Sequence, residues 1–96
     1  MALQRIERSP TFLRQAKSLG RKHYDLDKLE RVVRVLVNED KETLRRRYHD
    51  HALKGNLSVF RELHIESDWL LIYRVKHETL TLLLVETGSH RQLLGK

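Results

Sequence analysis

The sequence predicts an α+β domain in which two helices pack on a twisted antiparallel β-sheet, with a short strand before the helices and a turn or brief helix after the sheet. Three observations support this fold class. Apolar residues recur at helical spacing in the first half, three β-rich runs follow in the second half, and 96 residues suffice for only one core. Residues 1–96 are therefore expected to form a single domain.

The first 20 residues contain the signals for a strand and a helix. Leu3 and Ile6 lie in an alternating segment that predicts the short N-terminal strand. Ser9 followed by Pro10 is typical of an N-cap and a first helical residue. Apolar residues then recur at helical spacing until Gly20, where the first helix is expected to end.

A second helix is expected from Asp25, a residue suited to capping, to about Asn38. Its apolar residues form one stripe at helical spacing. This periodicity is a stronger signal than the slightly lower helix propensity of its β-branched valines. The stripe consists of Leu26, Leu29, Val32, Val33, Leu36 and Val37. The charged segment 41–48 that follows shows no clear preference.

The second half predicts an antiparallel meander of three strands over residues 57–65, 69–76 and 79–86. Short polar segments connect these runs. Residues 69–73 are apolar on both faces, which is typical of a central strand. Only a turn or a brief helix is expected after the last strand.

The composition favours a partner that carries negative charge. Nineteen lysines and arginines against thirteen aspartates and glutamates give a net charge of +6, which is typical of proteins that bind nucleic acid or an acidic protein. A basic surface that serves only solubility is the alternative. The absence of cysteine excludes disulfides and thiolate metal sites. Because no segment resembles a signal peptide or a membrane span, we expect no membrane partner and a cytoplasmic location.

The six histidines admit three explanations. In the first, imidazoles act as general base and general acid near neutral pH, and RNA suits this chemistry because its own 2′-hydroxyl is the nucleophile, so that no metal or other cofactor is needed. In the second, His49 and His51 bind a metal ion together with His64 or Asp68. In the third, a histidine at a strand end only hydrogen-bonds a neighbouring carbonyl. For any one histidine taken alone, the third explanation is the strongest.

Basic and aromatic residues near these histidines predict contacts with single-stranded RNA. A triple arginine is just as often only a solvated face, and the single tryptophan is at least as well suited to anchor the core as to stack on a base. The residues expected to contact RNA are Arg45, Arg46, Arg47, Lys54, Arg61, Trp69 and Arg91.

A set of spaced residues covers positions 48–93: Tyr48, Asp50, His51, Leu53 and Gly55, then Phe60, Arg61, His64, Ile65, Asp68, Trp69, Leu71, Ile72 and Tyr73, and finally Thr87, Gly88, Ser89, His90 and Leu93. This pattern closely resembles the YafQ branch of the RelE/ParE superfamily of bacterial type II toxins. The first half of the chain resembles the branch less closely but has the expected β-α-α order.

The resemblance implies a ribosome-dependent mRNA endonuclease that cleaves codons in the ribosomal A site. By position, it implies the active-site residues His51, His64, Asp68 and His90, with Trp69 beside them. His90 is expected to be the general acid, while the other three share the roles of base, orientation and phosphate contact. The remaining histidines match no motif position and are expected to be surface or structural residues: His23, His49 and His77.

The resemblance also implies partners: the ribosome with its mRNA, and a cognate antitoxin that holds the toxin inactive. Because the domain is basic, the binding segment of the antitoxin is expected to be acidic, to fold on contact and to cover the basic groove.

Two positions depart from the pattern of the branch. Close relatives can carry a basic residue before the Thr-Gly step, where this chain has Glu86, and an aromatic residue near the C-terminus is replaced by Leu94. A carboxylate beside the scissile phosphate repels it unless it faces elsewhere. Transition-state charge is therefore expected to be met by Arg61, Arg91 or Lys54.

Three other functions remain open from the sequence. One is a ParE-like poison of DNA gyrase, which needs no paired acid and base. Another is a nucleic-acid-binding module without catalysis. The third is a toxin that binds its antitoxin but no longer cuts RNA.

Overall fold

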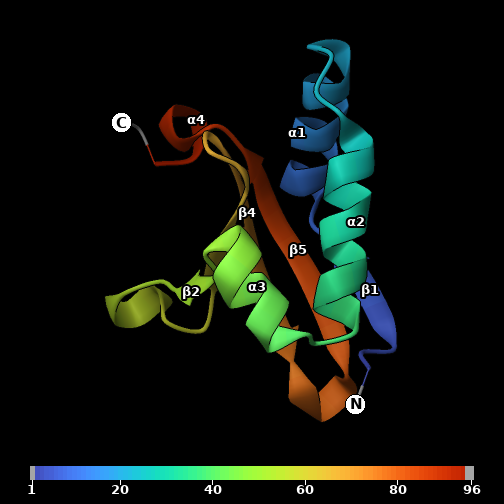
Figure 1. The fold of residues 1–96 in the computed structure, drawn as a ribbon, viewed down its shortest axis with the longest axis vertical. Coiled ribbons are helices and arrows are strands. Elements are labelled where there is room, and N and C mark those ends of the chain that lie inside the picture. Colours follow the sequence, from blue (N-terminus) through green and yellow to red (C-terminus); the bar gives the residue numbers. More distant parts are fainter. Residues whose placement is uncertain (1, 95–96) are drawn as a thin grey trace.

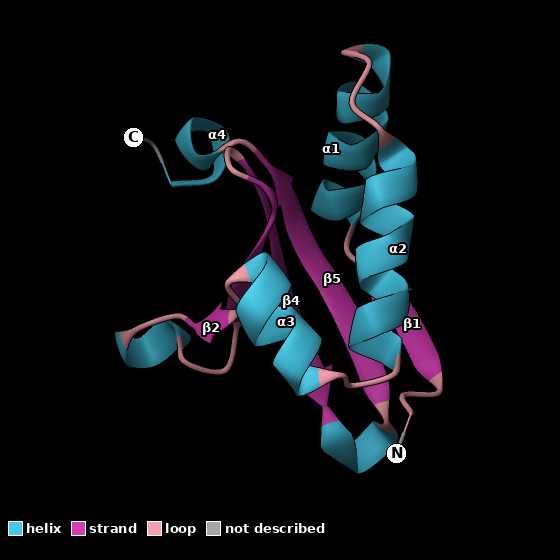
Figure 2. Ribbon diagram, viewed as in Figure 1, coloured by secondary structure: helices cyan, strands magenta, loops and turns pink. Residues whose placement is uncertain are grey.

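The computed structural model describes residues 2–94, with the exception of the Leu94 side chain. Its helices α1 (Pro10–Arg21), α2 (Leu26–Val37) and α3 (Lys41–Tyr48) lie against a five-stranded sheet (Figure 1; Figure 2). Among the described residues, no helix is long and apolar enough to span a membrane.

The N-terminal strand and the first helix form where the sequence predicts them. Strand β1 spans Arg5–Arg8, and α1 begins at Pro10. The Ser9 hydroxyl accepts a hydrogen bond from the Phe12 N–H (2.9 Å), as expected of an N-cap. Phe12 and Leu19 are the buried residues of α1, so the apolar stripe of this helix faces the sheet.

The second predicted helix is also confirmed, but a third helix follows it. α2 begins after its cap, Asp25, and ends at Val37. α3 covers the segment for which the sequence shows no preference, and Asp40 caps it by accepting the Thr43 N–H (3.2 Å). Leu44 is the buried residue of α3. Leu44 and the partly buried Tyr48 are too few to form a stripe, which explains why periodicity does not indicate this helix.

The sheet has the strand order β1-β5-β4-β3-β2, with β2 at His51–Ala52, β3 at Arg61–Glu66, β4 at Trp69–Lys76 and β5 at Thr81–Gly88. The three longest strands form the predicted antiparallel meander, and β4 is central. However, β1 pairs with β5 in parallel, so the prediction of a purely antiparallel sheet is wrong. Three helices separate β1 from the other strands, and such a crossover allows a parallel pairing that a tight hairpin does not.

The first strand of the meander starts later than predicted. Gly55–Leu57 form a short 3-10 turn that begins at a glycine with φ of 66°. Leu57 and Val59 are about half exposed, and β3 starts only at Arg61. At the other end of the sheet, the expected brief helix is present as α4, His90–Leu94.

Alternate residues of the meander build the core on the face covered by the helices. On β3 these are Leu63 and Ile65, and on β4 they include Leu71 and Tyr73. Glu62 and His64, which alternate with Leu63 and Ile65 on β3, are directed to the opposite face of the sheet. The sheet therefore separates the helix layer from a face that carries titratable side chains.

Candidate active site

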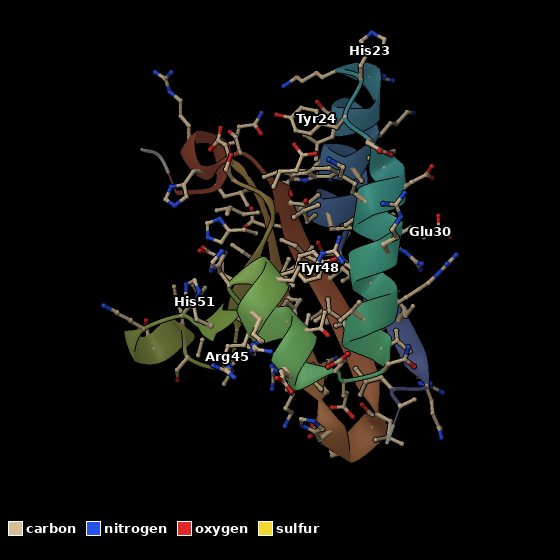
Figure 3. The ribbon with its side chains drawn as sticks, viewed as in Figure 1. His23, Tyr24, Glu30, Arg45, Tyr48 and His51 are labelled. Atoms are coloured by element: carbon tan, nitrogen blue, oxygen red, sulfur yellow. The ribbon has the colours of Figure 1, made fainter. Side chains whose placement is uncertain are left out.

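His51 lies where the chain leaves α3 and joins the edge of the sheet. α3 ends at His49 in the left-handed conformation (φ 53°), which turns the chain into β2. The Nδ1 atom of His51 lies 2.9 Å from the His49 carbonyl oxygen, so the ring is held as a donor at Nδ1. Figure 3 shows His51 on the side of α3 that faces away from α2. Its side chain is 52% exposed and can reach a substrate.

Glu62 joins His51 to His64. It lies opposite His51 in the β2–β3 register, and its Oε1 atom lies 3.5 Å from Nε2 of His51 and 3.9 Å from Nε2 of His64. Its side chain is only 6% exposed. The ring of His49 lies edge-on to that of His64, with centroids 6.0 Å apart. These four residues, His49, His51, Glu62 and His64, form the histidine cluster.

The sequence does not single out Glu62, because a glutamate in a strand is most often solvated. One signal was available: Glu62 and His64 are two positions apart in a β-run, so their side chains share a face. His49 is likewise expected to be a surface or structural residue, yet the structure places its ring beside that of His64.

Asp68 and His90 come together at the other end of the site. The Asp68 Oδ1 atom accepts the backbone N–H of His90 (3.2 Å), which fixes the start of α4. Within α4, Ser89 accepts the Gln92 N–H (3.2 Å), while the Gln92 side chain accepts the Ser89 N–H (3.0 Å) in a reciprocal cap. A Cβ atom at Gly88 would lie 2.8 Å from Gln92 Oε1, so a side chain at this position would displace the Gln92 amide from the cap.

The two parts of the site lie on adjacent strands of the sheet. His64 pairs with Leu70 on β4, and Leu70 pairs with Gly88 on β5. At the usual strand spacing, the backbones of His64 and Gly88 are therefore about 10 Å apart across the sheet. α4 begins two residues after Gly88. His64, Asp68 and His90 thus lie toward one end of the β3-β4-β5 meander, and His51 lies beside it on the edge strand β2.

Two residues predicted to contact RNA have other roles in the structure. Trp69 is 1% exposed, donates from Nε1 to the Thr87 hydroxyl (3.0 Å) and packs edge-on against Tyr24 with ring centroids 5.1 Å apart. No face of its ring is free to stack on a base, so this prediction is wrong and Trp69 anchors the core. The Arg61 guanidinium is bound by Asp50 through two hydrogen bonds (2.8 and 3.0 Å), so we replace its predicted RNA contact by a structural role.

The remaining predicted cations point in several directions. Arg45 lines a cleft of about 630 Å³ between α3 and the sheet, Arg46 pairs with Glu42 (3.1 Å), and the Arg47 guanidinium lies 5.8 Å from the centre of the Tyr48 ring. Lys54 and Arg91 are exposed. Arg91 directly follows His90 on α4, so of all the predicted cations it is the neighbour of His90 in the chain.

Glu86, the departure from the family's pattern, has a partner on α1. Its Oε1 atom accepts a hydrogen bond from the Gln15 amide (3.4 Å), and the Gln15 carbonyl oxygen accepts the Thr87 N–H (2.8 Å). Gln15 therefore draws this carboxylate toward the helix layer. The Leu94 side chain, the other departure, lies outside the described residues.

A second surface feature lies between α2 and α3. A groove of about 440 Å³, called the α2–α3 groove, has a basic rim and an apolar floor that includes Val35 and Ile65. Figure 3 shows Tyr48 between the two helices, on the other side of α3 from His51. The α2–α3 groove is lined by Lys28, Arg31, Arg34, Val35, Arg47, Tyr48 and Ile65.

The metal explanation receives no support from the geometry of the described residues. Within residues 2–94, no group of three or more histidine, cysteine, aspartate or glutamate side chains is arranged to hold a metal ion. The arrangement that the described part of the chain does present is two histidines around a buried carboxylate, and a third histidine anchored by Asp68.

A small α+β domain with this strand order, and with histidines and carboxylates along one end of its meander, defines the class of RelE-like bacterial type II toxins. Residues 4–95 match the family model described as the bacterial toxin of type II toxin-antitoxin system, YafQ. The chain therefore belongs to the YafQ family.

Individual relatives agree with this assignment. The mRNA interferase toxin YafQ of Escherichia coli K12 is 33% identical over 90 residues, which cover 94% of this chain and 95% of the relative. The crystal structure of a metal-bound toxin from Helicobacter pylori superposes with a TM-score of 0.85 at 42% identity, covering 97% of this chain and 99% of that one. The toxin-antitoxin complex DinJ-YafQ of E. coli contains a chain with a TM-score of 0.85 at 32% identity, with coverage of 97% and 99%.

Proposed function

We propose that this chain is the toxin of a type II toxin-antitoxin system and cleaves mRNA on the ribosome as an endoribonuclease. The observation that carries the proposal is the placement of His51 and His64 around the buried Glu62, with His90 held by Asp68 at the end of the neighbouring strands. Three imidazoles along one edge supply both a proton acceptor and a proton donor. Membership of a family whose E. coli relative is named an mRNA interferase supports the same reaction.

In the proposed reaction, a histidine of the cluster, His51 or His64, removes the proton from the RNA 2′-hydroxyl. The 2′-oxygen then forms a bond to the adjacent phosphorus, and the bond from phosphorus to the 5′-oxygen breaks. His90 donates its proton to the departing 5′-oxygen. The products are a 2′,3′-cyclic phosphate and a 5′-hydroxyl, and the balance of protons needs no metal ion.

The negative charge of the phosphorane must be met by a cation that has no other partner. Arg61 is already bound to Asp50. Glu86, which would repel the phosphorane, is drawn away from it by Gln15. We therefore assign the contact with the phosphorane to Arg91, which follows His90 on α4. Lys54, exposed beside the histidine cluster in sequence, is proposed to contact the flanking RNA backbone together with the arginines of α3.

The proposed regulatory partner is an acidic antitoxin in the same cytoplasm as the ribosome. The E. coli relative is found in a complex with DinJ. We place the acidic segment of the antitoxin in the α2–α3 groove, because an apolar floor with a basic rim fits an amphipathic acidic peptide. An RNA backbone has no apolar groups that would bury the apolar floor of this groove, so RNA is the poorer occupant.

The proposal is tested by inducible expression of the wild type and of His90→Ala in a bacterial host, with mapping of mRNA 5′ ends on ribosomes. We expect growth arrest and in-frame cuts for the wild type only, with little difference between the thermal melts of the two proteins because His90 lies outside the core. Arrest by both proteins without cuts would show a gyrase poison or a binding inhibitor instead.

A further inference from the structure

Asp50 is a buried carboxylate between two members of the histidine cluster in the chain. Its side chain is 9% exposed. Oδ2 accepts two hydrogen bonds from Arg61, from Nη2 at 2.8 Å and from Nε at 3.0 Å, and Oδ1 accepts the hydroxyl hydrogen of Tyr73. Both carboxylate oxygens are thus occupied by donors from neighbouring strands, and the bonds to Arg61 are charge-assisted.

This network spans three strands and the end of a helix. In the sheet register, Ala52 on β2 lies opposite Arg61 on β3, which lies opposite Tyr73 on β4. The backbone N–H of Asp50 also donates to the Leu44 carbonyl oxygen of α3 (3.1 Å). Asp50 therefore connects the C-terminus of α3 to the sheet at the row next to that of His51 and Glu62.

The network has a consequence for His51 because β2 is so short. A two-residue edge strand, His51–Ala52, has few ladder hydrogen bonds to hold it. The Asp50 network ties the chain down immediately before His51. The cross-strand contact with Glu62 then holds the imidazole on the opposite face of the sheet.

We propose that Asp50, Arg61 and Tyr73 form a positioning network that holds His51 in place beside Glu62 for reaction with RNA. This inference rests on the proposed function, in which His51 belongs to the active site. None of the three residues touches the reacting atoms. They act through His51, and their effect is the placement of one imidazole.

The test compares Tyr73→Phe, which removes one hydroxyl, and Asp50→Asn, which keeps the shape of the side chain. The matched control is Tyr24→Phe, which removes a tyrosine hydroxyl beside Trp69, away from the network. We expect kcat for RNA cleavage to fall roughly tenfold in Tyr73→Phe and further in Asp50→Asn, with KM unchanged, because misplacing a catalytic group costs turnover more than binding. The control retains the wild-type kcat.

A double-mutant cycle separates positioning from general stability. In a His51→Ala background, Tyr73→Phe is expected to cause no further loss of the residual kcat, because the group on which it acts is absent. Equal losses with and without His51, or no loss in Tyr73→Phe at all, would overturn the proposal.

A measurement that does not depend on RNA cleavage tests the positioning network even if the proposed function is wrong. The Leu53 amide donates to the Phe60 carbonyl oxygen (3.0 Å) next to β2, so its hydrogen exchange reports opening of this edge. We expect faster exchange at Leu53, together with shifted ring resonances of His51, in Tyr73→Phe but not in Tyr24→Phe. If the wild type cuts no RNA, the proposed function fails while this measurement still decides the positioning; unchanged exchange and unchanged His51 resonances would reject it.

Discussion

At the scale of single residues, carboxylates decide where the histidines lie. Glu62 holds His51 and His64 at ion-pair distance, and Asp68 fixes the backbone of His90. Asp50 is proposed to position His51 without contacting its ring, through its hydrogen bonds to Arg61 and Tyr73. In the proposed function the histidines carry out the proton transfers, and carboxylate oxygens from other parts of the chain hold them in place.

Tyr73 allows a prediction about alkaline pH. Burial, and then the hydrogen bond to Asp50, raise the pKa of Tyr73 well above the value near 10.0 of an unperturbed tyrosine. Its contribution to stability is fully present below the unfolded pKa and is lost as the pH rises above it, because the unfolded chain then releases this proton while the folded chain keeps it. Above about pH 10, the free energy of unfolding should therefore fall more steeply in the wild type than in Tyr73→Phe, and the difference in slope should approach about 1.4 kcal/mol per pH unit.

Urea unfolding of both proteins at a series of pH values measures this difference. Tyr24→Phe, whose partner is an aromatic ring, serves as the control and should follow the wild type. Parallel stability curves for the wild type and Tyr73→Phe above pH 10 would contradict the prediction.

At the scale of the elements, sequence patterns locate those helices and strands that have strong local signals. α1 and α2 follow from their caps, Ser9 and Asp25, and from a continuous apolar stripe. α3 does not follow, because Leu44 and the partly buried Tyr48 are its only core contacts among eight residues, too few for a stripe. The parallel direction of β1 depends on three helices that no local pattern relates to β5. The candidate site divides in the same way: spacing indicates the histidines predicted to be catalytic, whereas the place of Glu62 beside them follows only from the pairing of two strands.

The connection between α1 and β5 provides a prediction at this scale. The Ser9 hydroxyl accepts the Phe12 N–H (2.9 Å) and donates to the Val85 carbonyl oxygen (2.6 Å), next to the irregularity in the β4–β5 ladder. Ser9→Ala removes both bonds at once. We expect it to lower the free energy of unfolding by about 1–2 kcal/mol in urea titrations.

Ser18→Ala in the same helix is the control for the loss of Ser9. Its expected change is within about 0.5 kcal/mol, as is typical of substitutions that remove no cap. A similar effect of the two substitutions would show that the Ser9 hydroxyl does not tie the helix to the sheet.

At the scale of the whole molecule, the chain separates two kinds of surface on either side of α3. The histidine cluster lies where α3 meets the sheet edge, and the α2–α3 groove lies on the other side of the helix (Figure 3). In the groove, Lys28 and Arg34 pair with Glu66 and Glu30, at 2.6 and 3.0 Å. Within residues 2–94, Arg31 and Arg47 have no acidic side chain within ion-pair distance, so the groove keeps an excess of positive charge.

This excess predicts how the antitoxin is held. In a variant that combines Arg31→Glu with Arg47→Glu, the affinity for the acidic antitoxin of the same operon should fall at least about tenfold, since like charges then face each other across the groove. Calorimetric titration at low and moderate salt measures the effect, which should shrink as salt screens the charges. The control combines Arg5→Glu with Arg8→Glu, the same change in net charge on β1 at the opposite edge of the sheet. Equal affinities of the two variants would mean that the antitoxin senses only the total charge of the domain, and the α2–α3 groove would lose its role as the docking site.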